Sequence, residues 1–580
     1  MVSKCIAAAI DFGTEFSGWA CSFQHEYEEE PTKIYVRQWP KGNLSSKAPT
    51  SVLIKPDGKT FEAFGYEAED RYVELAEEDY HENWYYFRRF KMHLYDVTRL
   101  RRNFEIKDET GKPLRAMTVF NMAINFLKED LLQHCNTRSL VKISLDDIKW
   151  VITVPAIWND SARQFMREAA VEAGIPSDNL IIALEPECAS ILCRLQKIDK
   201  VAGEESFSLL KEGSQYMVLD AGGGTVDITV HKLCVGGKLQ ELYKASGGAW
   251  GGIQVDHAFR QFIIGIVGSQ VYKNFTEKNM EDYIHMLRDF EIKKRDFEPR
   301  KSARISMRFP PSLKDIYETE SGENIHEAIG KTRYANRVHF IKDKLRIEAE
   351  QRKDFFGMAI DAITNHVRDL LAKPMVIGTT TVLMVGGFSE SKVLQDAIQS
   401  NFPDMKTIVP QDAGLAVLKE AVLYGHCPTT VITRIARYTY GLGLDPVFQE
   451  GIHDESKRRT DHCLDGIRYR CRDVFDKIVE LGQSINVGEE IYAAECFPSD
   501  YEDFFTDLNL YASRKISPKY VTDVDCFKLG TMRVSIEDMS VPRQERLIKV
   551  FILFGSTEIK VRAVESRTGR NTKCTIDFLI

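Results

Sequence analysis

The sequence lacks several features that mark other classes of protein. Its 580 residues contain no apolar run near the about 18–20 residues that a membrane-spanning helix needs. The net charge is −8, so there is no basic excess of the kind that binds nucleic acid through a broad positive field. The first apolar strand follows directly on residues 1–5, and we therefore expect no signal peptide.

Paired cysteine motifs are also missing. The chain has 12 cysteines, but no two form a Cys-x-x-Cys pair, and its 13 histidines show no zinc-ligand spacing. A disulfide framework is not expected in a long chain without a secretory leader. We therefore expect reduced thiols and a cytoplasmic location.

What remains is the composition of an ordinary globular protein. Hydrophobic residues make up 43% of the chain and charged residues 28%. A chain of this length exceeds what a single core can fill, so about three or four domain-sized units are expected.

One short phrase occurs twice, each time as an apolar strand that ends at an aspartate and runs into glycine. A carboxylate at a strand end can orient water around Mg²⁺, and glycine lets the backbone bring its N–H groups close to an anion. A third apolar strand also ends in a glycine pair. Two related lobes that close on one nucleotide are therefore predicted. The three segments are IAAAIDFGT at 6–14, YMVLDAGGGTVD at 216–227 and VLMVGG at 382–387.

Strands and helices alternate over the first 428 residues, which favours an α/β fold with a parallel or mixed sheet. After Pro428 the sequence pattern changes to short apolar strands separated by turn residues, which predicts an all-β sandwich. No long helical segment follows these strands. The expected elements are strands at 6–11, 150–155, 216–220 and 381–385, helices at 118–135, after Asn159 and over 356–370, and later strands near 440–444, 491–495, 508–512, 531–536, 548–553 and 558–564.

In this order, the segments resemble the heat-shock 70-kDa chaperone family, within the actin-like ATPase fold. The match covers nearly the whole chain, and its 12A/12B branch is the most similar part of the family. The resemblance implies a two-lobed actin-like nucleotide-binding domain over 1–428, with lobe I at about 1–215, lobe II at about 216–428 and some exchange of segments. It implies a β-sandwich without a helical lid over 429–580. The matching segments are 150–164 (WVITVPAIWNDSARQ), 184–190 (LEPECAS), 220–227 (DAGGGTVD) and 563–573 (AVESRTGRNTK) for the family, and 165–170 (FMREAA), 181–187 (IIALEPE) and 473–477 (DVFDK) for the branch.

The resemblance also implies ligands and roles. ATP or ADP would lie between the lobes, and Asp11, Glu185 and Asp220 would hold the water molecules around Mg²⁺. Asp227 or Thr225 would orient the attacking water. The residues implied to bind the nucleotide are Gly13, Thr14, Gly222, Gly223, Gly224, Thr225, Glu291, Lys294, Arg295, Gly386 and Gly387.

Some of these assignments have simpler alternatives. Glu185 and Pro186 could cap a helix, and the charged run 291–295 could be a solvated helix face. The family's catalytic lysine has no clean counterpart, and Arg89 or Lys91 is the candidate. An arginine there would neutralise charge as a planar fork rather than as a compact ammonium.

The chain departs from the family pattern at several positions. Glu15 and Phe16 replace a threonine and a tyrosine, and a carboxylate beside a triphosphate is repulsive unless it faces a cation or solvent. Phe388 and Glu390 stand where the family has a Ser-x-Arg segment, so the arginine that packs on adenine is absent. The junction at 426–435 lacks the family's acidic linker residue. These departures predict ATP binding with slow or absent hydrolysis.

Three functions fit the sequence. The favoured one is an ATP-binding, chaperone-like protein whose sandwich binds extended peptide segments or one dedicated protein partner, with nucleotide-exchange or J-type co-chaperones as further partners. The alternative is a nucleotide-gated scaffold or signalling adaptor with little or no ATPase activity. A small-molecule kinase on the same fold is disfavoured by the C-terminal strands. Neither nucleic acid nor a membrane span is expected.

Overall fold

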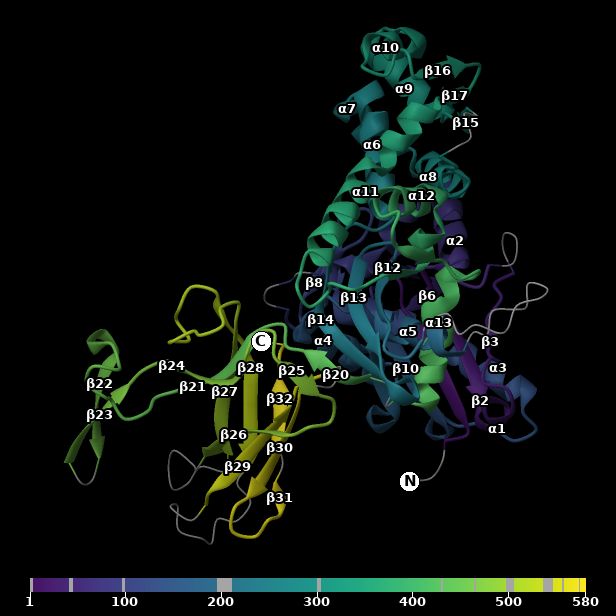
Figure 1. Ribbon diagram of the computed structural model, residues 1–580. Coiled ribbons are helices and arrows are strands. Elements are labelled where there is room, and N and C mark those ends of the chain that lie inside the picture. The colour runs from purple at the N-terminus through teal and green to yellow at the C-terminus, as the bar shows by residue number, and fades with distance from the viewer. Residues whose placement is uncertain are drawn as a thin grey trace.

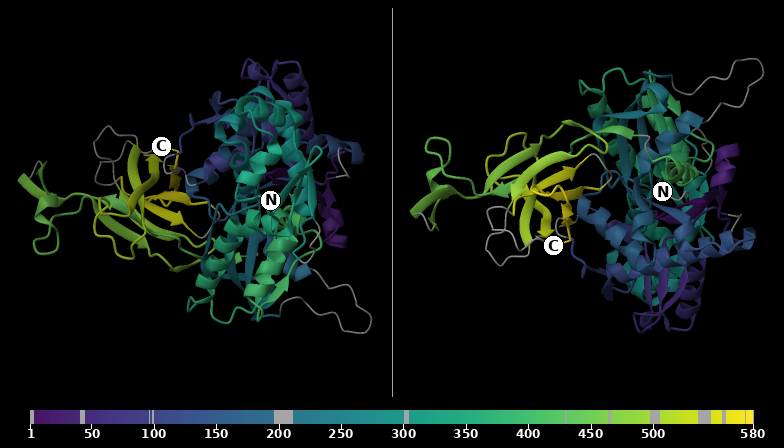
Figure 2. Two further views of the ribbon diagram at one scale, coloured as in Figure 1. Left: turned by 90° about the horizontal axis from the view of Figure 1, so that it is seen from above. Right: turned by 90° about the horizontal axis from the view of Figure 1, so that it is seen from below.

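The computed structural model describes residues 4–40, 45–95, 97, 100–195, 211–299, 304–428, 431–463, 466–496, 505–535, 546–554, 558–572 and 574–579. An α/β part occupies one side of the molecule, and the C-terminal strands, coloured yellow-green, lie beside it in all three views (Figures 1 and 2). Within the described residues, no helix is long and apolar enough to cross a membrane. The cysteines described are free, and Cys21 and Cys135 place their Sγ atoms 3.7 Å apart.

The first large sheet is built around the first glycine phrase. Its order is β11-β10-β1-β2-β3, with β4 also paired to β2. β1 is parallel to β10 and antiparallel to β2, so the turn after Asp11 is the tip of a hairpin. The strands are β1 (Ile6–Asp11), β2 (Phe16–Phe23), β3 (Tyr35–Val36), β4 (Ala48–Pro49), β10 (Ile148–Val154) and β11 (Leu180–Leu184).

Both faces of this sheet are buried. Side chains alternate along a strand, and Ile6, Ala8 and Ile10 accordingly join the core that contains α3 and α4, while Ala7 and Ala9 pack against α13. These helices are α3 (Ala116–Arg138), α4 (Asp160–Glu172) and α13 (Ala413–His426). α4 begins where the sequence predicts, because the Asn159 side chain accepts a hydrogen bond from the Ala162 N–H.

The second large sheet repeats this arrangement around the second phrase. Its order is β19-β18-β12-β13-β14-β20-β25. β12 forms an antiparallel hairpin with β13 and runs parallel to β18, which carries the third glycine pair at its end. Two of its strands, β20 and β25, follow position 428 in the chain. The strands are β12 (Gln215–Ala221), β13 (Val226–Leu233), β14 (Leu239–Gly248), β18 (Thr381–Val385), β19 (Lys406–Ile408), β20 (Val431–Ile435) and β25 (Ser484–Asn486).

Smaller units complete the α/β part. A three-stranded sheet with a helix lies next to the first large sheet, and a helical projection with a small sheet extends from the second, at the top of Figure 1. The first unit contains β5 (Ser51–Ile54), β6 (Phe61–Phe64), α2 (Tyr66–Glu77) and β7 (Tyr85–Arg88), followed by the short helix η2 (Phe90–Leu94). The projection contains α6 (Ile253–Val267), α7 (Ser269–Lys278), α8 (Met280–Arg295), β15 (Ile305–Arg308), α9 (Pro311–Ser321), α10 (Ile325–Lys331), β16 (Val338–Ile341), β17 (Lys344–Ile347) and α11 (Ala349–Leu371). Two further helices, α5 (Glu185–Leu195) and α12 (Lys392–Asn401), lie nearer the large sheets.

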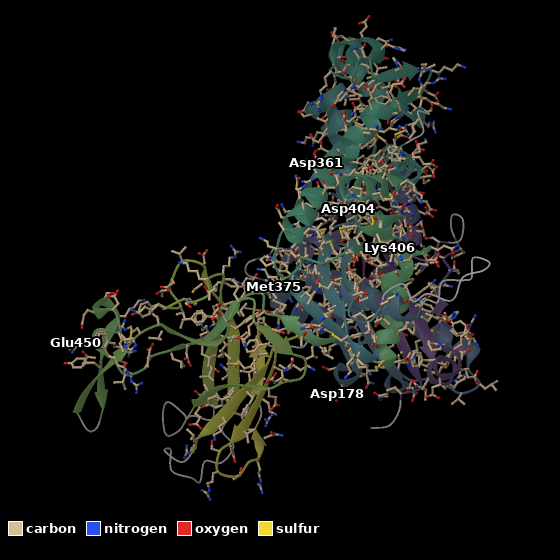
Figure 3. All side chains as sticks on the ribbon, in the orientation of Figure 1. Asp178, Asp361, Met375, Asp404, Lys406 and Glu450 are labelled. Atoms are coloured by element: carbon tan, nitrogen blue, oxygen red, sulfur yellow. The ribbon has the colours of Figure 1, made fainter. Side chains whose placement is uncertain are left out.

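The C-terminal part consists of strands. A five-stranded sheet, β24-β21-β27-β28-β32, and a four-stranded sheet, β26-β29-β30-β31, share one apolar core. The hairpin β22–β23 projects from them, and Figure 3 shows Glu450 beside it at the far end of this part. The strands are β21 (Thr439–Leu444), β22 (Arg458–Cys463), β23 (Gly466–Cys471), β24 (Val474–Val479), β26 (Ile491–Cys496), β27 (Phe505–Ser513), β28 (Cys526–Ser535), β29 (Ile548–Leu553), β30 (Lys560–Glu565), β31 (Asn571–Thr572) and β32 (Cys574–Asp577).

Candidate functional site

The ends of β1, β12 and β18 open onto one cavity of ≈ 490 Å³. Almost every residue that the sequence pointed to lines it. Asp227 and Arg89 are the exceptions. The predicted residues in the lining are Asp11, Gly13, Thr14, Lys91, Glu185, Asp220, Gly222, Gly223, Gly224, Thr225, Glu291, Lys294, Arg295, Gly386 and Gly387.

The two glycine hairpins meet closely at this cavity. A Cβ atom added to Gly224 would lie 2.5 Å from Thr14 Oγ1 of the opposite hairpin. The backbone of the second hairpin is fixed by hydrogen bonds from the Gly222 N–H to the Thr225 carbonyl and from the Ile253 N–H to the Gly223 carbonyl, of 2.9 and 2.8 Å. Because a side chain at Gly224 would clash, only glycine permits this approach.

Gly386, at the end of β18, approaches the second hairpin in a similar way. Its φ is 85°, and an added Cβ would lie 2.5 Å from both the Ala221 carbonyl oxygen and Asp220 Oδ1. The conformation and the space both require glycine. The third glycine pair therefore closes the cavity beside the Asp220 carboxylate.

Three carboxylates, those of Asp11, Glu185 and Asp220, line the cavity, and their negative charges repel one another. Asp11 Oδ1 accepts a hydrogen bond of 2.8 Å from Thr153 Oγ1, and its Oδ2 lies 2.5 Å from Lys47 Nζ. Burial raises the pKa of Asp11, but the contacts with Lys47, the charge of Lys91 and the hydrogen bond from Thr153 together lower it below its usual value. Burial raises the pKa of Glu185 to about 7, although the ammonium of Lys91 opposes the shift.

Asp220 differs from the other two carboxylates. Its Oδ2 is buried, and no hydrogen-bond partner for it is found in the part of the chain that the structure describes. Burial, together with the negative charges of Glu185 and Asp227, raises the pKa of Asp220 well above its usual range. A buried, unpartnered carboxylate oxygen that faces other carboxylates fits a hydrated cation, because the cation would relieve both burial and repulsion.

Asp227 is buried and does not line the cavity. Its Oδ1 accepts a 2.7 Å hydrogen bond from the Ile157 N–H, which joins the second hairpin to the segment after β10. Burial raises its pKa. Thr225, the other candidate to orient water, does line the cavity.

Arg89 and Lys91, the two candidates for the family's lysine, point to different places. Lys91 Nζ lies 2.8 Å from Glu185 Oε1 at the carboxylate cluster, and it is buried. Arg89 instead pairs with Glu15 at 2.8 Å and with Asp256 at 2.5 Å. Of the two, only Lys91 lines the cavity.

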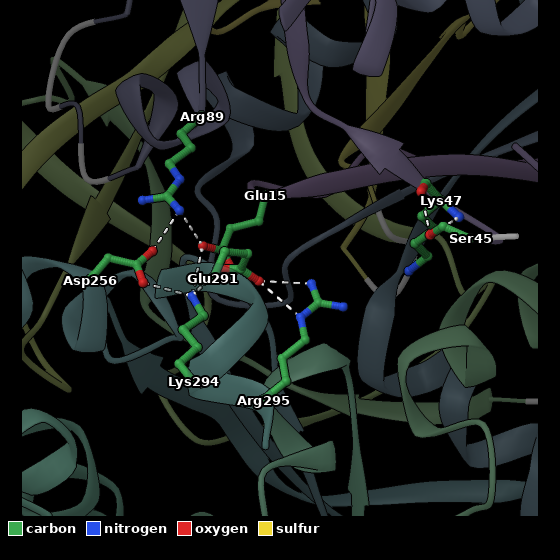
Figure 4. Close-up of polar contacts among 8 residues, drawn as sticks. All are labelled: Glu15, Ser45, Lys47, Arg89, Asp256, Glu291, Lys294 and Arg295. Carbon is green, nitrogen blue, oxygen red and sulfur yellow. Dashed lines mark hydrogen bonds and ion pairs between the residues drawn. The ribbon is translucent and has the colours of Figure 1, made fainter. Parts of the chain in front are cut away.

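Glu15 belongs to a compact charged network, drawn in Figure 4. It faces the cations Arg89 and Lys294, at 2.8 and 3.5 Å. Burial still raises the pKa of Glu15 to about 7, because Lys294 and Arg89 only partly offset it. A carboxylate beside a triphosphate is repulsive unless it faces a cation or solvent, and Glu15 faces two cations.

The run 291–295 is the last turn of α8, and it is not simply a solvated face. Lys294 is buried and bonds Asp256 Oδ1 at 2.8 Å, besides pairing with Glu291. Arg295 donates to Glu291 Oε1 at 2.8 and 3.0 Å, and its guanidinium lies 4.8 Å from the centre of the Phe16 ring. The apolar face of α8, which includes Phe290, packs in the core and fixes this turn at the cavity.

The replaced segment 388–390 has taken up packing and backbone contacts. The Phe388 ring stacks with that of Phe356, with centroids 6.2 Å apart. Glu390 Oε1 accepts a 2.9 Å hydrogen bond from the Gly414 N–H at the start of α13. Glu390 thus holds the backbone rather than projecting freely into the cavity.

The sequence reasoning missed one prominent cation, Lys47. It comes from the segment 45–47 between β3 and β4, which carries no recognisable motif. Its Nζ contacts both Asp11 Oδ2 and, at 2.7 Å, the Gly414 carbonyl oxygen. Ser45 donates to the Lys47 carbonyl oxygen at 2.7 Å and fixes the turn, as Figure 4 shows.

Comparison with known proteins agrees with this geometry. Residues 87–323 match the family model described as Hsp70 protein. The chain is 34% identical over 637 residues to heat shock 70 kDa protein 12A of Homo sapiens, covering 100% of this chain and 92% of that protein. The chain belongs to the Hsp70 family.

Further relatives show how the similarity is distributed. The Hsp70 chain is 34% identical over 642 residues to heat shock 70 kDa protein 12B of Homo sapiens, covering 91% of that protein. It is also 34% identical to the chaperone protein DnaK of Nitrosopumilus maritimus, but over 162 residues, or 28% of this chain. The divergent 12A/12B branch therefore matches from end to end, whereas this DnaK matches in part.

Proposed function

We propose that this Hsp70-family chain binds ATP in the cavity and couples the bound nucleotide to the binding of a peptide or protein partner by its C-terminal strands. The observation that carries the proposal is the meeting of two glycine hairpins with Asp11, Glu185, Asp220 and Lys91 in one cavity. The two large sheets would be the lobes that close on the nucleotide, with 1–428 as most of the nucleotide-binding domain. Within 429–580, β20 and β25 pair in the second large sheet, and the other strands would form the β-sandwich.

The residues have complementary tasks in this proposal. Backbone N–H groups around Gly13 and Thr14, and from Gly222 to Thr225, would hold the phosphates from opposite sides. Asp220, Glu185 and Asp11 would hold Mg²⁺ through its water molecules, and the ion would supply charge neutralisation of the phosphates when bound. Glu291, Lys294 and Arg295 would hold the nucleoside end, and Gly386 and Gly387 would close beside it.

Hydrolysis to ADP would be slow. Lys91 would stabilise negative charge on the phosphates, and Thr225 would orient the attacking water. Asp227 would act from outside the cavity lining by holding the segment around Ile157, rather than by touching the water. It is therefore a positioning residue in this proposal.

The coupling would run through α5 and β20. Glu185 begins α5 at the cavity, and Glu187, in the same first turn, binds Arg434 of β20 through two hydrogen bonds of 2.6 Å. Ile435, the next residue of β20, donates its N–H to Glu241 Oε2 at 2.7 Å. A shift of the first turn of α5 on nucleotide binding would thus reach the strand that leads into the C-terminal part.

A second interface would support this coupling. Arg167 of α4 pairs with Glu558, and Arg102 pairs with Asp577 at 2.9 Å. The Gln164 side chain accepts a 2.8 Å hydrogen bond from the Phe578 N–H. The C-terminal strands therefore contact the α/β part at the helix that follows β10 as well as at β20.

The experiment is peptide binding measured with and without Mg-ATP, on a panel of unrelated apolar peptides. Binding of many peptides that Mg-ATP loosens would support the chaperone-like function. Failure to bind any peptide while ATP still binds would instead favour the alternative, a nucleotide-gated scaffold or adaptor with one dedicated partner. Nucleotide-exchange and J-type co-chaperones are candidate partners of the chaperone-like form, and a cytoplasmic location is proposed with it.

A further inference from the structure

Lys47 brings a second ammonium to the phosphate end of the cavity, in addition to Lys91. Both residues line the cavity, and they arise from separate segments of the chain. Lys47 Nζ lies 2.5 Å from Asp11 Oδ2, whereas Lys91 Nζ lies 2.8 Å from Glu185 Oε1. Two of the three carboxylates expected to hold hydrated Mg²⁺ are therefore already paired with lysines.

The pairing of Asp11 is complete on both oxygens. Thr153 donates to Oδ1 at 2.8 Å, and Lys47 occupies Oδ2. Asp220 Oδ2, in contrast, has no partner within the described part of the chain. The ammonium of Lys47 thus provides a positive charge beside Asp11. A hydrated cation would therefore bind on the side of Asp220, whose Oδ2 has no partner among the described residues.

The position of Lys47 is held from a second side. Its ammonium also donates to the Gly414 carbonyl oxygen at 2.7 Å, while the Gly414 N–H donates to Glu390 Oε1 at 2.9 Å. An ammonium has three N–H donors. Two are used by Asp11 and Gly414, which leaves one for an anion in the cavity that Lys47 lines.

We propose that Lys47 binds the phosphates of the nucleotide and supplies positive charge that Mg²⁺ would otherwise supply alone, so that the cavity holds ADP and ATP without a divalent cation. This inference rests on the proposed nucleotide binding. A lysine is suited to this task because its ammonium is a compact point charge that binds phosphate without a fixed fork geometry.

The test is equilibrium binding of ADP and of ATP by calorimetry, in excess Mg²⁺ and in excess EDTA, on the full chain and on Lys47→Met and Lys47→Arg. For the wild type, we expect the Kd to rise less than about 5-fold in EDTA, because the ammonium remains. For Lys47→Met we expect the Kd in EDTA to be about 10- to 100-fold higher than the Kd in Mg²⁺, which is the range for loss of a charged hydrogen bond. Lys47→Arg keeps the charge and should behave more like the wild type.

Lys55→Met is the matched control. Lys55 follows β5, forms a partly exposed ion pair of 3.3 Å with Glu62 and does not line the cavity. Its ratio of Kd values with and without Mg²⁺ should equal that of the wild type. Thermal melting of each variant shows whether it is folded, and the wild-type ratio alone tests the inference if Lys47→Met does not fold.

Three outcomes would overturn the inference. If the wild type binds Mg-ATP but its Kd rises by more than about 5-fold in EDTA, Lys47 does not replace the cation, although the proposed nucleotide binding stands. If Lys47→Met and the wild type show the same ratio, the charge of Lys47 does not act on the phosphates. If the wild type binds no nucleotide under either condition, the proposed function fails as well.

Discussion

The carboxylate of Glu187 holds the guanidinium of Arg434 through two hydrogen bonds of 2.6 Å, and both side chains are buried. This pair joins the first turn of α5, which begins at the cavity with Glu185, to β20, which precedes the C-terminal strands. Breaking a buried pair leaves one uncompensated charge, and this is strongly destabilising.

Glu187→Gln is therefore expected to lower the free energy of unfolding by about 3 kcal/mol, because Arg434 keeps its buried charge. Urea unfolding followed by circular dichroism measures this change. The matched control is Glu490→Gln, which removes a carboxylate from the partly exposed pair with Arg562 and should cost less than about 1 kcal/mol. Equal losses in the two variants would contradict the special role of the buried pair.

Asp220→Asn is expected to raise the melting temperature of the chain without nucleotide. Its carboxylate is buried beside Glu185 and Asp227, and the raised pKa records the resulting cost of its charge. An uncharged amide removes that cost. Differential scanning fluorimetry without added Mg²⁺ or nucleotide tests this, and a lower melting temperature than that of the wild type would count against the repulsion.

Glu420→Gln should show a pH-dependent gain in stability. Burial raises the pKa of Glu420 from its ordinary value of 4.5 to about 8. The native state therefore binds the proton more tightly than the unfolded state, so the wild type loses stability as pH rises from about 4.5 to about 8, with a slope of at most about 1.4 kcal/mol per pH unit. The glutamine variant lacks this slope.

The measurement for Glu420→Gln is urea unfolding at several pH values across that window. The free energy of unfolding of the variant minus that of the wild type should increase with pH. A difference that stays constant, or that decreases, would show that Glu420 is not held in its protonated form by burial.

Lys91→Met should reduce ATP turnover by about 100-fold or more, as expected when one preorganised group that stabilises transition-state charge is removed. Phosphate release under saturating Mg-ATP measures it. Lys128→Met is the control, because Lys128 is also buried but donates to the Ala173 carbonyl oxygen away from the cavity. Turnover that falls equally in both variants would indicate loss of fold rather than loss of a cavity cation.

Much of the local structure could be predicted from the sequence. The strand expected at 6–11 is β1, and the helix expected at 118–135 is α3 with a few residues added at each end. Apolar periodicity and an asparagine cap are local signals, which explains this agreement. The glycine phrases likewise indicated the cavity, because their spacing after an aspartate is rarely accidental.

The remaining features depend on contacts between distant segments. Nothing near Lys47 in the sequence shows that it meets Asp11, and nothing near Glu15 shows that Arg89 and Lys294 neutralise it. The pairing of β20 with β14 is equally invisible locally, because strand register between distant segments is set by the whole sheet. For this reason the sequence predicted a domain boundary at position 428, although β20, which follows it, pairs with β14 of the second large sheet.

The most direct test of the central claim is calorimetric binding of Mg-ATP to the purified chain beside Gly224→Val. The account predicts binding by the wild type and at least about 10-fold weaker binding by the variant, because a Cβ at Gly224 would lie 2.5 Å from Thr14 Oγ1 and would force apart the two hairpins that hold the phosphates. No binding by the wild type, or equal binding by both, would contradict the assignment of this cavity as the nucleotide site.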